Sequence, residues 1–232
     1  MKILESRLPK HIAFIMDGNG RWAQRRALPR KLGHKAGVEA IKKTIDACIK
    51  FGVKYCSFFA FSTENWKRSK DEIDGIFALV RDYLNNNSDY FIERQVKIES
   101  IGVLTPFPED LKLSLETLKQ KTKHFDRTTV IFALNYGGRD DIARACEKLV
   151  AKGHQQITED KISENLDSAR FPDPDFVIRT SGEQRLSNFM LFQMAYSELY
   201  FPKVYWPDFN EKQLKKAILK YQKRDRRYGG LK

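Results

Sequence analysis

The most constraining feature of this chain is a regular alternation between short apolar stretches and longer segments with helical periodicity. Stretches rich in β-branched and aromatic residues predict strands at 11–16, 53–61, 96–103, 129–136 and 175–180. Apolar positions that recur at helical spacing predict helices at 33–51, 71–94, 111–123, 140–152 and 211–224. Strands that alternate with helices of this length form βαβ units, so we expect a mostly parallel sheet flanked by helices.

No Pro/Gly/Ser-rich linker interrupts the alternation, so we expect one α/β domain over residues 1–232. Within it, 1–10 is an N-terminal extension and 211–232 is a basic C-terminal helix and tail. A hydrophobic fraction of 41% with 31% charged residues excludes a disordered chain. No signal peptide is evident, the apolar runs are far shorter than the roughly 20 residues that span a bilayer, and the three cysteines include no CxxC pair. We therefore expect a cytoplasmic protein.

The formal net charge of +12 is concentrated in two short segments. Residues 21–43 carry eight basic side chains and one acidic one, and residues 211–232 carry nine and two, so each segment contributes +7. Such a localised excess indicates a binding site for an anion better than uniform surface charge does.

The stretch DGNGR at 17–21 follows the first predicted strand, at the sheet edge where ligands of α/β proteins gather. Its two glycines permit a turn whose N–H groups converge on a phosphate, and Arg21, with Arg30 and His34 further on, adds donors. A carboxylate such as Asp17 beside a diphosphate makes sense when Mg²⁺ lies between them. Two other interpretations stay open, a simple strand-to-helix turn and the glycine pattern of dinucleotide-binding folds.

Polar side chains also follow the second predicted strand, at 62–68 (STENWKR), a variety typical of residues that line a site. A helix start explains part of this segment, with Ser69 as the N-cap and Glu72 completing a capping box. The two interpretations are compatible, because the cap leaves 62–68 free.

The segment 179–188 (RTSGEQRLSN) places Arg179 and Arg185 around a turn of small residues after a predicted strand. This arrangement predicts a second diphosphate clamp, against the alternative of a solvated charge run. Glu198 lies among aromatic residues, where a carboxylate is expected to bind a metal or to pair with an arginine.

Together these stretches resemble the cis-prenyltransferases, and within them the bacterial undecaprenyl diphosphate synthases. The motifs occur in the family's order as HIAFIMDGNGRW at 11–22, AFSTENWKR at 60–68, NYGG at 135–138, IRTSGEQRLSN at 178–188, AYSELY at 195–200 and WPDF at 206–209. The resemblance implies a Mg²⁺-dependent homodimeric transferase that condenses isopentenyl diphosphate with farnesyl diphosphate, forming cis double bonds. Its implied product is a long polyprenyl diphosphate, undecaprenyl diphosphate, the lipid carrier for cell-wall synthesis.

The resemblance also implies roles for individual residues. Asp17 would be the essential carboxylate that engages Mg²⁺, Asn65 would assist proton removal, and Glu198 matches a metal-site carboxylate. The allylic diphosphate would be held by Gly18, Asn19, Gly20, Arg21, Arg30 and His34, with Trp22 beside it. Isopentenyl diphosphate would be bound by Arg179, Arg185 and Ser187, next to Leu186, and the remaining site residues would be Ser62, Thr63, Glu64, Trp66 and Arg68.

The growing hydrocarbon chain is purely apolar and needs an apolar tunnel, which strand 55–61 and helix 71–94 would wall, with Ala60 matching a small residue beside it. Gln184 stands where some members carry a His near the metal, so a metal role for Gln184 stays open. Ser181 replaces a common Gly, which matters only if the turn requires positive φ. Arg227-Tyr228-Gly229 matches a C-terminal motif that, in the family, reaches the active site across the dimer.

On this interpretation Arg25, Arg26 and Lys31 of the first basic segment have no assigned role. The lysines of the second segment are equally consistent with a solvated face and with attraction to anionic lipid at the inner face of the membrane. Two functions of other classes are an RNA-binding module that uses the basic segments and a dinucleotide-dependent oxidoreductase. No RNP-like or KH-like motif supports the first, so nucleic acid is not an expected partner.

Overall fold

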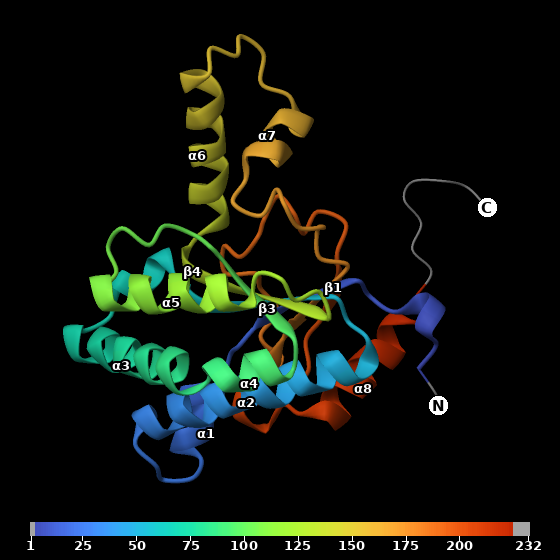
Figure 1. Ribbon diagram of the computed structural model, residues 1–232. Helices are drawn as coiled ribbons and strands as arrows, with labels where there is room; N and C mark the ends of the chain where they lie inside the picture. Colours follow the sequence, from blue (N-terminus) through green and yellow to red (C-terminus); the bar gives the residue numbers. More distant parts are fainter. Residues whose placement is uncertain (1–2, 225–232) are drawn as a thin grey trace.

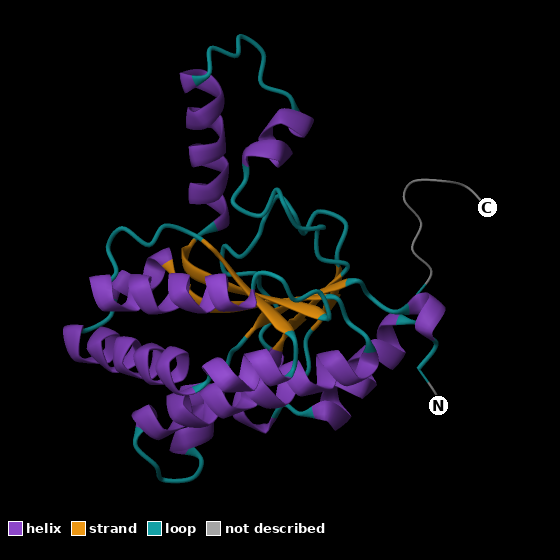
Figure 2. Cartoon of the chain, in the orientation of Figure 1, coloured by secondary structure: helices purple, strands orange, loops and turns teal. Residues whose placement is uncertain are grey.

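A computed structural model describes residues 3–224, which form one six-stranded sheet with helices packed around it (Figures 1 and 2). The strand order is β3-β4-β2-β1-β5-β6, and every neighbouring pair is parallel. The strands are β1 His11–Ile15, β2 Tyr55–Ser62, β3 Val96–Ile101, β4 Thr128–Tyr136, β5 Phe176–Arg179 and β6 Glu198–Tyr200. The predicted single α/β domain with a parallel sheet is confirmed, and β6 is a short edge strand that the sequence pattern did not predict.

The helices agree with the periodicity except at three places. They are α1 Asn19–Gln24, α2 Arg30–Phe51, α3 Lys70–Asn86, α4 Ser88–Glu93, α5 Glu109–Thr122, α6 Gly138–Ala151, α7 Glu159–Asn165 and α8 Glu211–Tyr221. Short 3-10 turns are η1 Glu5–Arg7, η2 Thr63–Lys67, η3 Thr180–Gly182 and η4 Trp206–Asp208. Two of the differences, α1 and α7, are too short for periodicity to reveal them.

The third difference is the helix predicted at 71–94, which is two helices divided at Asn87. The backbone of Asn87 leaves the helical region, at φ −124° and ψ 14°, and its side-chain amide donates to the Tyr83 carbonyl oxygen at 2.7 Å. Asn competes in this way for backbone groups at helix ends. The prediction of one continuous helix is therefore wrong, although the apolar face continues from α3 into α4.

Alternate residues of the central strand β1 face two separate cores. Ile12 and Phe14 point into a core shared with α2, α3, α5 and α8, whereas Ala13 and Ile15 point to the opposite face. The second face is packed against an irregular segment after β5, in which Phe189 stacks on the ring of Phe59 with centroids 4.4 Å apart. The helices that pack against β1 therefore lie mainly on one side of the sheet.

Helices α6 and α7 pack against each other and form an arm that projects away from the sheet (Figure 1). At its base, Arg144 donates to both carboxylate oxygens of Asp167 at 2.7 Å each, and the buried Asp141 accepts from the Tyr136 hydroxyl at 2.8 Å. The outer surface of the arm includes Val150, which is 64% exposed. These hydrogen bonds hold the arm at its base, while its outer surface carries an exposed apolar side chain.

Hydrogen bonds hold the two ends of the described chain together. Leu4 and the side chain of Gln222, at the end of α8, exchange hydrogen bonds of 3.2 and 2.7 Å, and Arg7 donates to the Gln222 carbonyl.

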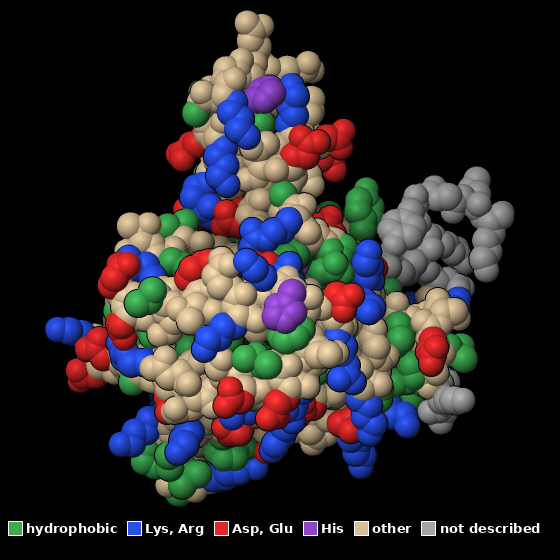
Figure 3. Space-filling view, in the orientation of Figure 1, with side chains coloured by type: hydrophobic (Ala, Val, Ile, Leu, Met, Phe, Trp, Pro, Cys, Tyr) green, Lys and Arg blue, Asp and Glu red, His purple; other side chains and the backbone are tan. Residues whose placement is uncertain are grey.

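Basic and acidic side chains interleave over the face shown in Figure 3. No helix within residues 3–224 combines the length and the apolar character needed to cross a membrane.

The buried His11 at the start of β1 predicts a pH-dependent stability. Its Nδ1–H donates to the Pro172 carbonyl at 2.6 Å, and its Nε2 accepts from the Ser57 hydroxyl at 2.7 Å. Burial lowers the pKa of His11 to about 4, from the ordinary 6.5. As the pH falls from about 6.5 to about 4, the unfolded chain gains a proton that the folded chain does not, so the free energy of unfolding should fall by roughly 3 kcal/mol.

Denaturant titrations across this pH range, on the wild type and on His11→Gln, test this expectation. The variant is expected to be less stable throughout but to lose most of the extra slope. Curves of equal slope for the two proteins would contradict it.

Candidate active site

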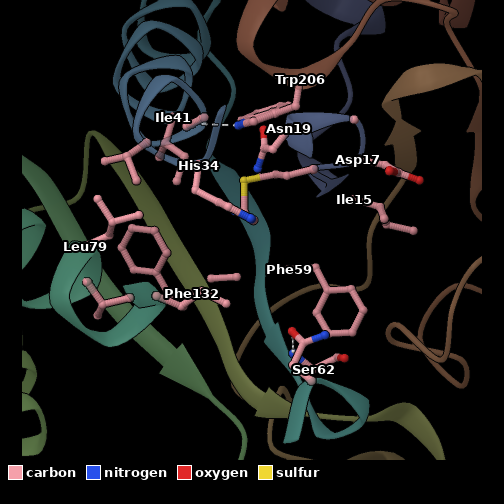
Figure 4. A pocket seen from close by; sticks show the side chains of 18 of the residues that line it. Ile15, Asp17, Asn19, His34, Ile41, Phe59, Ser62, Leu79, Phe132 and Trp206 are labelled. Atoms are coloured by element: carbon pink, nitrogen blue, oxygen red, sulfur yellow. Dashed lines mark hydrogen bonds between the residues drawn. The ribbon is translucent and has the colours of Figure 1, made fainter. Parts of the chain in front are cut away.

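A cavity of about 490 Å³ opens at the carboxyl ends of the central strands and lies between the sheet and helices α2 and α3 (Figure 4). One end is polar and is lined by residues that follow β1, β2 and β5. The other end is apolar and is lined by Ile41, Val80, Leu84, Leu115 and Phe132. In Figure 4, Leu79 and Phe132 lie together, apart from Asp17. The cavity thus joins a polar site to apolar space.

Asp17 is held between two arginines at the polar end. Arg179 donates to Oδ2 of Asp17 at 2.8 Å, and Arg21 donates to Oδ1 at 3.0 Å. Burial raises the pKa of Asp17, but the hydrogen bonds and charges of Arg179 and Arg21 outweigh it and hold that pKa below its usual value. Asp17 is therefore ionised at neutral pH, and it is the only acidic side chain among the described residues that line the cavity.

Glu183 links two arginines beside this carboxylate. Its Oε1 accepts from Arg21 at 2.6 Å and its Oε2 from Arg185 at 2.5 Å. Arg21 belongs to α1 and Arg185 to the loop after β5, so Glu183 brings together donors from two distant parts of the chain. The result is a cluster of guanidinium groups facing one cavity.

Ser181, where the family resemblance led us to expect Gly, has a φ of +74°, so the turn after β5 does adopt the left-handed conformation. A residue with a Cβ costs about 1 kcal/mol more than Gly there. The Ser181 hydroxyl, however, accepts a hydrogen bond from Arg21 at 2.7 Å. The replacement therefore adds a contact to Arg21 at the cost of backbone strain.

Close packing of α1 on α2 places Asn19 and His34 at the cavity. A Cβ on Gly33 would lie 2.1 Å from the Asn19 carbonyl oxygen, and one on Gly37 would lie 2.6 Å from Asn19 Oδ1. Asn19 Oδ1 and His34 Nε2 are both buried without a hydrogen-bond partner among the described residues. Unpaired buried polar atoms of this kind are typical of a site that receives a polar ligand.

The imidazole of His34 is neutral at neutral pH. Burial, together with the charges of Arg68 and Arg30, lowers the pKa of His34 below its usual value. A neutral imidazole can donate one hydrogen bond to an anion without adding a charge.

Replacing Gly33 with Ala should displace Asn19, because the new methyl group meets a backbone oxygen that cannot move freely. We expect a loss of roughly 1–3 kcal/mol in the free energy of unfolding and weaker binding of inorganic diphosphate. Thermal unfolding and isothermal titration calorimetry measure the two effects. The matched control is Gly75→Ala on α3, where no atom lies within 4 Å of the added Cβ; this variant should be slightly stabilised. Equal behaviour of the two variants would contradict the role of close packing.

The segment after β2 contains a capping box, but not at the predicted position. The Asn65 N–H donates to the Ser62 side chain, while Asn65 Oδ1 accepts from the Ser62 N–H at 3.0 Å. Ser69 caps α3 without a side-chain hydrogen bond, since Glu72 instead accepts from Arg68 at 2.7 Å and pairs with Arg30 at 3.4 Å. Ser69 is thus the N-cap residue of α3 as predicted, but the predicted capping box with Glu72 is not formed, because the Glu72 carboxylate pairs with two arginines instead.

The cavity brings together most of the predicted site residues. Those that line it are Asp17, Gly18, Asn19, Gly20, Arg21, Arg30, His34, Ser62, Asn65, Arg68, Arg179, Arg185 and Ser187. Those that do not line it are Trp22, Thr63, Glu64, Trp66, Leu186 and Glu198.

Several of the second group hold neighbouring segments together. The Trp66 indole donates to Asn135 at 2.8 Å, and the carboxylate of Glu64 accepts from Asn188 at 2.9 Å. Leu186 packs into the core on the opposite face of the sheet. These contacts tie the loop after β2 to the ends of β4 and β5, and so support the site from outside the cavity.

Glu198 lies at the start of β6 and is paired with Arg224. Within residues 3–224, no three His, Cys, Asp or Glu side chains converge as a metal site made only of protein ligands would require. A cation at this cavity would be bound by Asp17 together with substrate oxygens, which is a common way of holding Mg²⁺.

Gln184 is exposed in the loop after β5, and the motif Arg227-Tyr228-Gly229 lies outside the described residues.

Sequence reasoning missed Glu183 and Trp206. Trp206 lines the cavity, and its buried indole donates to the Gly37 carbonyl oxygen at 2.8 Å, which fixes α2 against η4. The WPDF motif contained this signal, since an indole buried at a site usually finds a hydrogen-bond partner. Nothing local marked Glu183, because its partners come from elsewhere in the chain.

Two of the unassigned basic residues have structural partners. Arg26 stacks over the Trp22 ring at 4.2 Å and pairs with Asp208 at 3.2 Å. Arg25 lies over the Tyr205 ring at 5.0 Å. Both contacts hold α1 against the segment around η4, and Lys31 is exposed at the start of α2.

A family model described as "Putative undecaprenyl diphosphate synthase" matches residues 15–229. The chain belongs to this family. It is 47% identical to an isoprenyl transferase of Clostridium perfringens, over 99% of this chain and 93% of the relative. A Micrococcus luteus relative, 46% identical over 97% of this chain and 93% of its own length, is a ditrans,polycis-undecaprenyl-diphosphate synthase specific for (2E,6E)-farnesyl diphosphate. The protein is therefore an enzyme of the cis-prenyltransferase class.

Solved structures share the fold over nearly the whole chain. Lavandulyl diphosphate synthase from Lavandula x intermedia, in complex with dimethylallyl diphosphate, is 33% identical with a TM-score of 0.93, and the match covers 97% of this chain and 100% of that one. A probable undecaprenyl diphosphate synthase from Campylobacter jejuni is 34% identical with a TM-score of 0.82, over 96% and 99% of the two chains. The names of these two proteins denote different products, although the fold is shared.

Proposed function

We propose that the protein condenses isopentenyl diphosphate with farnesyl diphosphate in repeated cis additions, giving undecaprenyl diphosphate. The observation that carries this proposal is the cavity itself. At its polar end Asp17 lies between Arg179 and Arg21, and its other end is apolar. Such a shape suits a diphosphate attached to a hydrocarbon chain. The full-length relatives support the same substrates and product.

In each addition the C–O bond of the allylic diphosphate breaks, a new C–C bond forms to the double bond of isopentenyl diphosphate, and that unit loses a proton. Negative charge develops on the leaving diphosphate. Arg21, Arg30, Asn19 and His34 face the place where it would lie, and they need no rearrangement to stabilise that charge.

The diphosphate of isopentenyl diphosphate would be bound by the loop after β5. Arg179 donates to Ser187 Oγ and to the Arg185 carbonyl oxygen, each at 2.7 Å, so its guanidinium has a fixed orientation. The Nε atom of Arg179 is buried without a hydrogen-bond partner among the described residues. These observations support Arg179, Arg185 and Ser187 as the binding residues for isopentenyl diphosphate.

Asn65 faces the same cavity and stays the residue that we assign to assist proton removal. Its Oδ1 is engaged by the Ser62 N–H, and a neutral carboxamide is a very weak base. We therefore infer that Asn65 orients the isopentenyl group while the proton departs.

Asp17 fits Mg²⁺ because it is ionised and is the only carboxylate among the described cavity-lining residues. When bound there with substrate oxygens, Mg²⁺ would supply positive charge opposite the diphosphate. Glu198 remains a proposed second carboxylate, although here it pairs with Arg224.

The apolar end would receive the growing chain. Each added unit buries about five carbons at roughly 0.8 kcal/mol per carbon, or about 4 kcal/mol. Strand β2 and helix α3 both contribute to the wall, with Phe59 and Ala60 on one side and Ile76 and Val80 on the other. This supports the predicted product tunnel.

The deciding experiment is chromatography of the products formed from farnesyl diphosphate and labelled isopentenyl diphosphate with Mg²⁺. We expect a long polyprenyl diphosphate and loss of incorporation when the metal is chelated. Absence of incorporation by the folded protein would overturn the proposal.

We also propose a homodimer that uses the α6–α7 arm. The exposed Val150 on this arm would be covered by a second copy. Analytical ultracentrifugation should show a dimer that Val150→Lys weakens, and a monomer at micromolar concentration would contradict the idea.

We propose that the protein is cytoplasmic and that α8 contacts the inner surface of the membrane. Five lysines and Leu219 form a shallow groove on its outer side: Lys212, Lys215, Lys216, Lys220 and Lys223. Each lysine near an anionic surface contributes about 1 kcal/mol. Binding to phosphatidylglycerol vesicles but not to phosphatidylcholine vesicles is expected, and equal binding to both would contradict the charge argument.

A further inference from the structure

The segments that follow β2, β4 and β5 meet at Asn188. Its side-chain Nδ2 donates to Oε1 of Glu64 at 2.9 Å, and its Oδ1 accepts from the Arg139 N–H at 2.9 Å. Its main-chain carbonyl oxygen accepts from the Gly138 N–H at 2.6 Å. Asn188 itself does not line the cavity. One residue therefore joins three segments from outside the site.

Asn188 supplies the cap that helix α6 lacks. The N-cap residue is Gly137, which has no side chain with which to accept from the first N–H groups of the helix. The N–H groups of Gly138 and Arg139 are bonded to Asn188 instead. A Cβ on Gly137 would lie 2.6 Å from Thr63 Oγ1 and 2.8 Å from Asn188 Nδ2. The missing side chain of Gly137 thus allows the segments after β2 and β5 to approach the start of α6.

The amide group of Asn188 can adopt only one orientation. Burial raises the pKa of Glu64, but hydrogen bonds, of which the one from Asn188 is the strongest, lower that pKa below its usual value. The Glu64 carboxylate is therefore ionised and can only accept, whereas the Arg139 N–H can only donate. The Asn188 NH₂ group must face Glu64, and its oxygen must face Arg139. Neither Asp nor an apolar side chain would satisfy both partners.

The backbone at Asn188 and at the residue before it is strained. Ser187 has a φ of +50° and Asn188 has a φ of +63°, so both are left-handed. A residue with a Cβ adopts this conformation at a cost, which is smaller for Asn than for most others. A strained turn of this kind persists only where its surroundings hold it in place. The hydrogen bonds of Asn188 to α6 and to Glu64 provide such surroundings.

The strained turn carries Ser187, and the segment bonded through Glu64 carries Asn65. The Ser187 hydroxyl lines the cavity and accepts from Arg179 at 2.7 Å. Asn65 follows Glu64 within η2 and also lines the cavity. Ser187 and Arg179 are assigned above to the diphosphate of isopentenyl diphosphate, and Asn65 is assigned to its isopentenyl group. Asn188 therefore connects the groups assigned to the two ends of one substrate.

We propose that Asn188 is a positioning residue for isopentenyl diphosphate. It holds the segment that binds the diphosphate and the segment that orients the isopentenyl group at the separation that this substrate needs. The inference rests on the proposed condensation reaction. The hydrogen bonds of Asn188 include neither the loop after β1 nor α2, which are assigned to farnesyl diphosphate. Loss of the Asn188 contacts should therefore affect one substrate and spare the other.

The test exchanges the two partners of the hydrogen bond between Asn188 and Glu64. Asn188→Asp places two carboxylates in contact, and we expect kcat/KM for isopentenyl diphosphate to fall by roughly 10–100-fold. The KM for isopentenyl diphosphate should rise, while the KM for farnesyl diphosphate stays close to the wild-type value. The double variant Asn188→Asp with Glu64→Gln again pairs an amide with a carboxylate and keeps the net charge, so it should recover most of the loss. Steady-state assays that vary each substrate in turn measure these effects, and thermal unfolding checks the fold of each variant.

A second variant and a control accompany the exchange. Asn188→Gly permits the left-handed turn and removes only the side-chain hydrogen bonds, so it replaces Asn188→Asp if that variant fails to fold, and it should show the same selective loss. The matched control is Asn86→Asp, at an exposed position where an Asn amide also donates to a carboxylate, that of Asp82, at 2.6 Å. This change should leave both KM values unaltered.

The proposal is overturned if folded Asn188→Asp keeps wild-type kinetics with isopentenyl diphosphate, if the KM values of both substrates rise equally, or if the double variant recovers nothing. The underlying reaction is tested separately by the wild type. A wild type that incorporates no isopentenyl diphosphate would mean that the proposed function has failed. A wild type that elongates normally, with Asn188 variants that show no selective loss, would mean that only the positioning role has failed.

Discussion

Replacing Asp17 with Ala should reduce incorporation of isopentenyl diphosphate by roughly 1,000-fold or more. The reason is that no other described residue lining the cavity has a carboxylate that could replace Asp17 in its proposed role as a ligand for Mg²⁺. Steady-state assays with farnesyl diphosphate and labelled isopentenyl diphosphate measure the effect. The loss should appear in kcat, because the interaction strengthens as the diphosphate leaves.

The stability of Asp17→Ala should be measured together with its activity. Arg179 is almost fully buried and would lose its carboxylate partner, so a decrease of roughly 1–3 kcal/mol in the free energy of unfolding is expected. Asp17→Asn keeps the shape and removes the charge, and it should be nearly as inactive as the Ala variant. Asp110→Ala, which breaks an exposed pair with Arg81, is the matched control and should be fully active. Near-normal turnover by folded Asp17→Ala would contradict the role given to this carboxylate.

Replacing Arg179 with Lys should raise the KM for isopentenyl diphosphate and lower kcat/KM by roughly 10–100-fold. The guanidinium of Arg179 donates to Asp17, to Ser187 and to the Arg185 carbonyl at the same time. Lysine keeps the charge but has a single nitrogen that cannot reach all three acceptors. The KM for farnesyl diphosphate should change much less, because that diphosphate is assigned to the loop after β1.

The control for this variant is Arg81→Lys, a similar change at an exposed ion pair. It should leave both KM values unaltered. If Arg179→Lys changes the two KM values equally, the division of the site into two diphosphate positions is wrong.

Much of this fold could be predicted from local patterns. The strands β1, β2 and β4 show nearly continuous apolar runs, as parallel strands buried on both faces should. The helix break at Asn87 and the position of the capping box could not be predicted. Each depended on which of several nearby partners a polar side chain would choose. The Asn87 side chain donates to the Tyr83 carbonyl oxygen, and the Glu72 carboxylate pairs with Arg68 and Arg30.

The candidate site also has a part that could be predicted from the sequence and a part that could not. Residues at or just after the carboxyl ends of strands, such as Asp17, Ser62 and Arg179, lie at the cavity because all parallel strands end on the same edge of the sheet. Trp22 and Trp66 were predicted to line the site with them, yet they face Asp208 and Asn135. Their motifs indicated the neighbourhood, whereas the side-chain direction depended on packing.

The sequence by itself determined that the sheet is parallel and that a carboxylate follows its first strand, because hydrophobic periodicity and strand ends are local properties. Only the tertiary structure decided which arginine reaches that carboxylate. Asp17 and Arg179 are 162 positions apart in the chain, and they meet because β1 lies between β2 and β5 in the sheet and pairs with both. The order of strands in a sheet is a choice among competing long-range pairings, and so is the meeting of Tyr83 with Phe132 at the apolar end of the cavity.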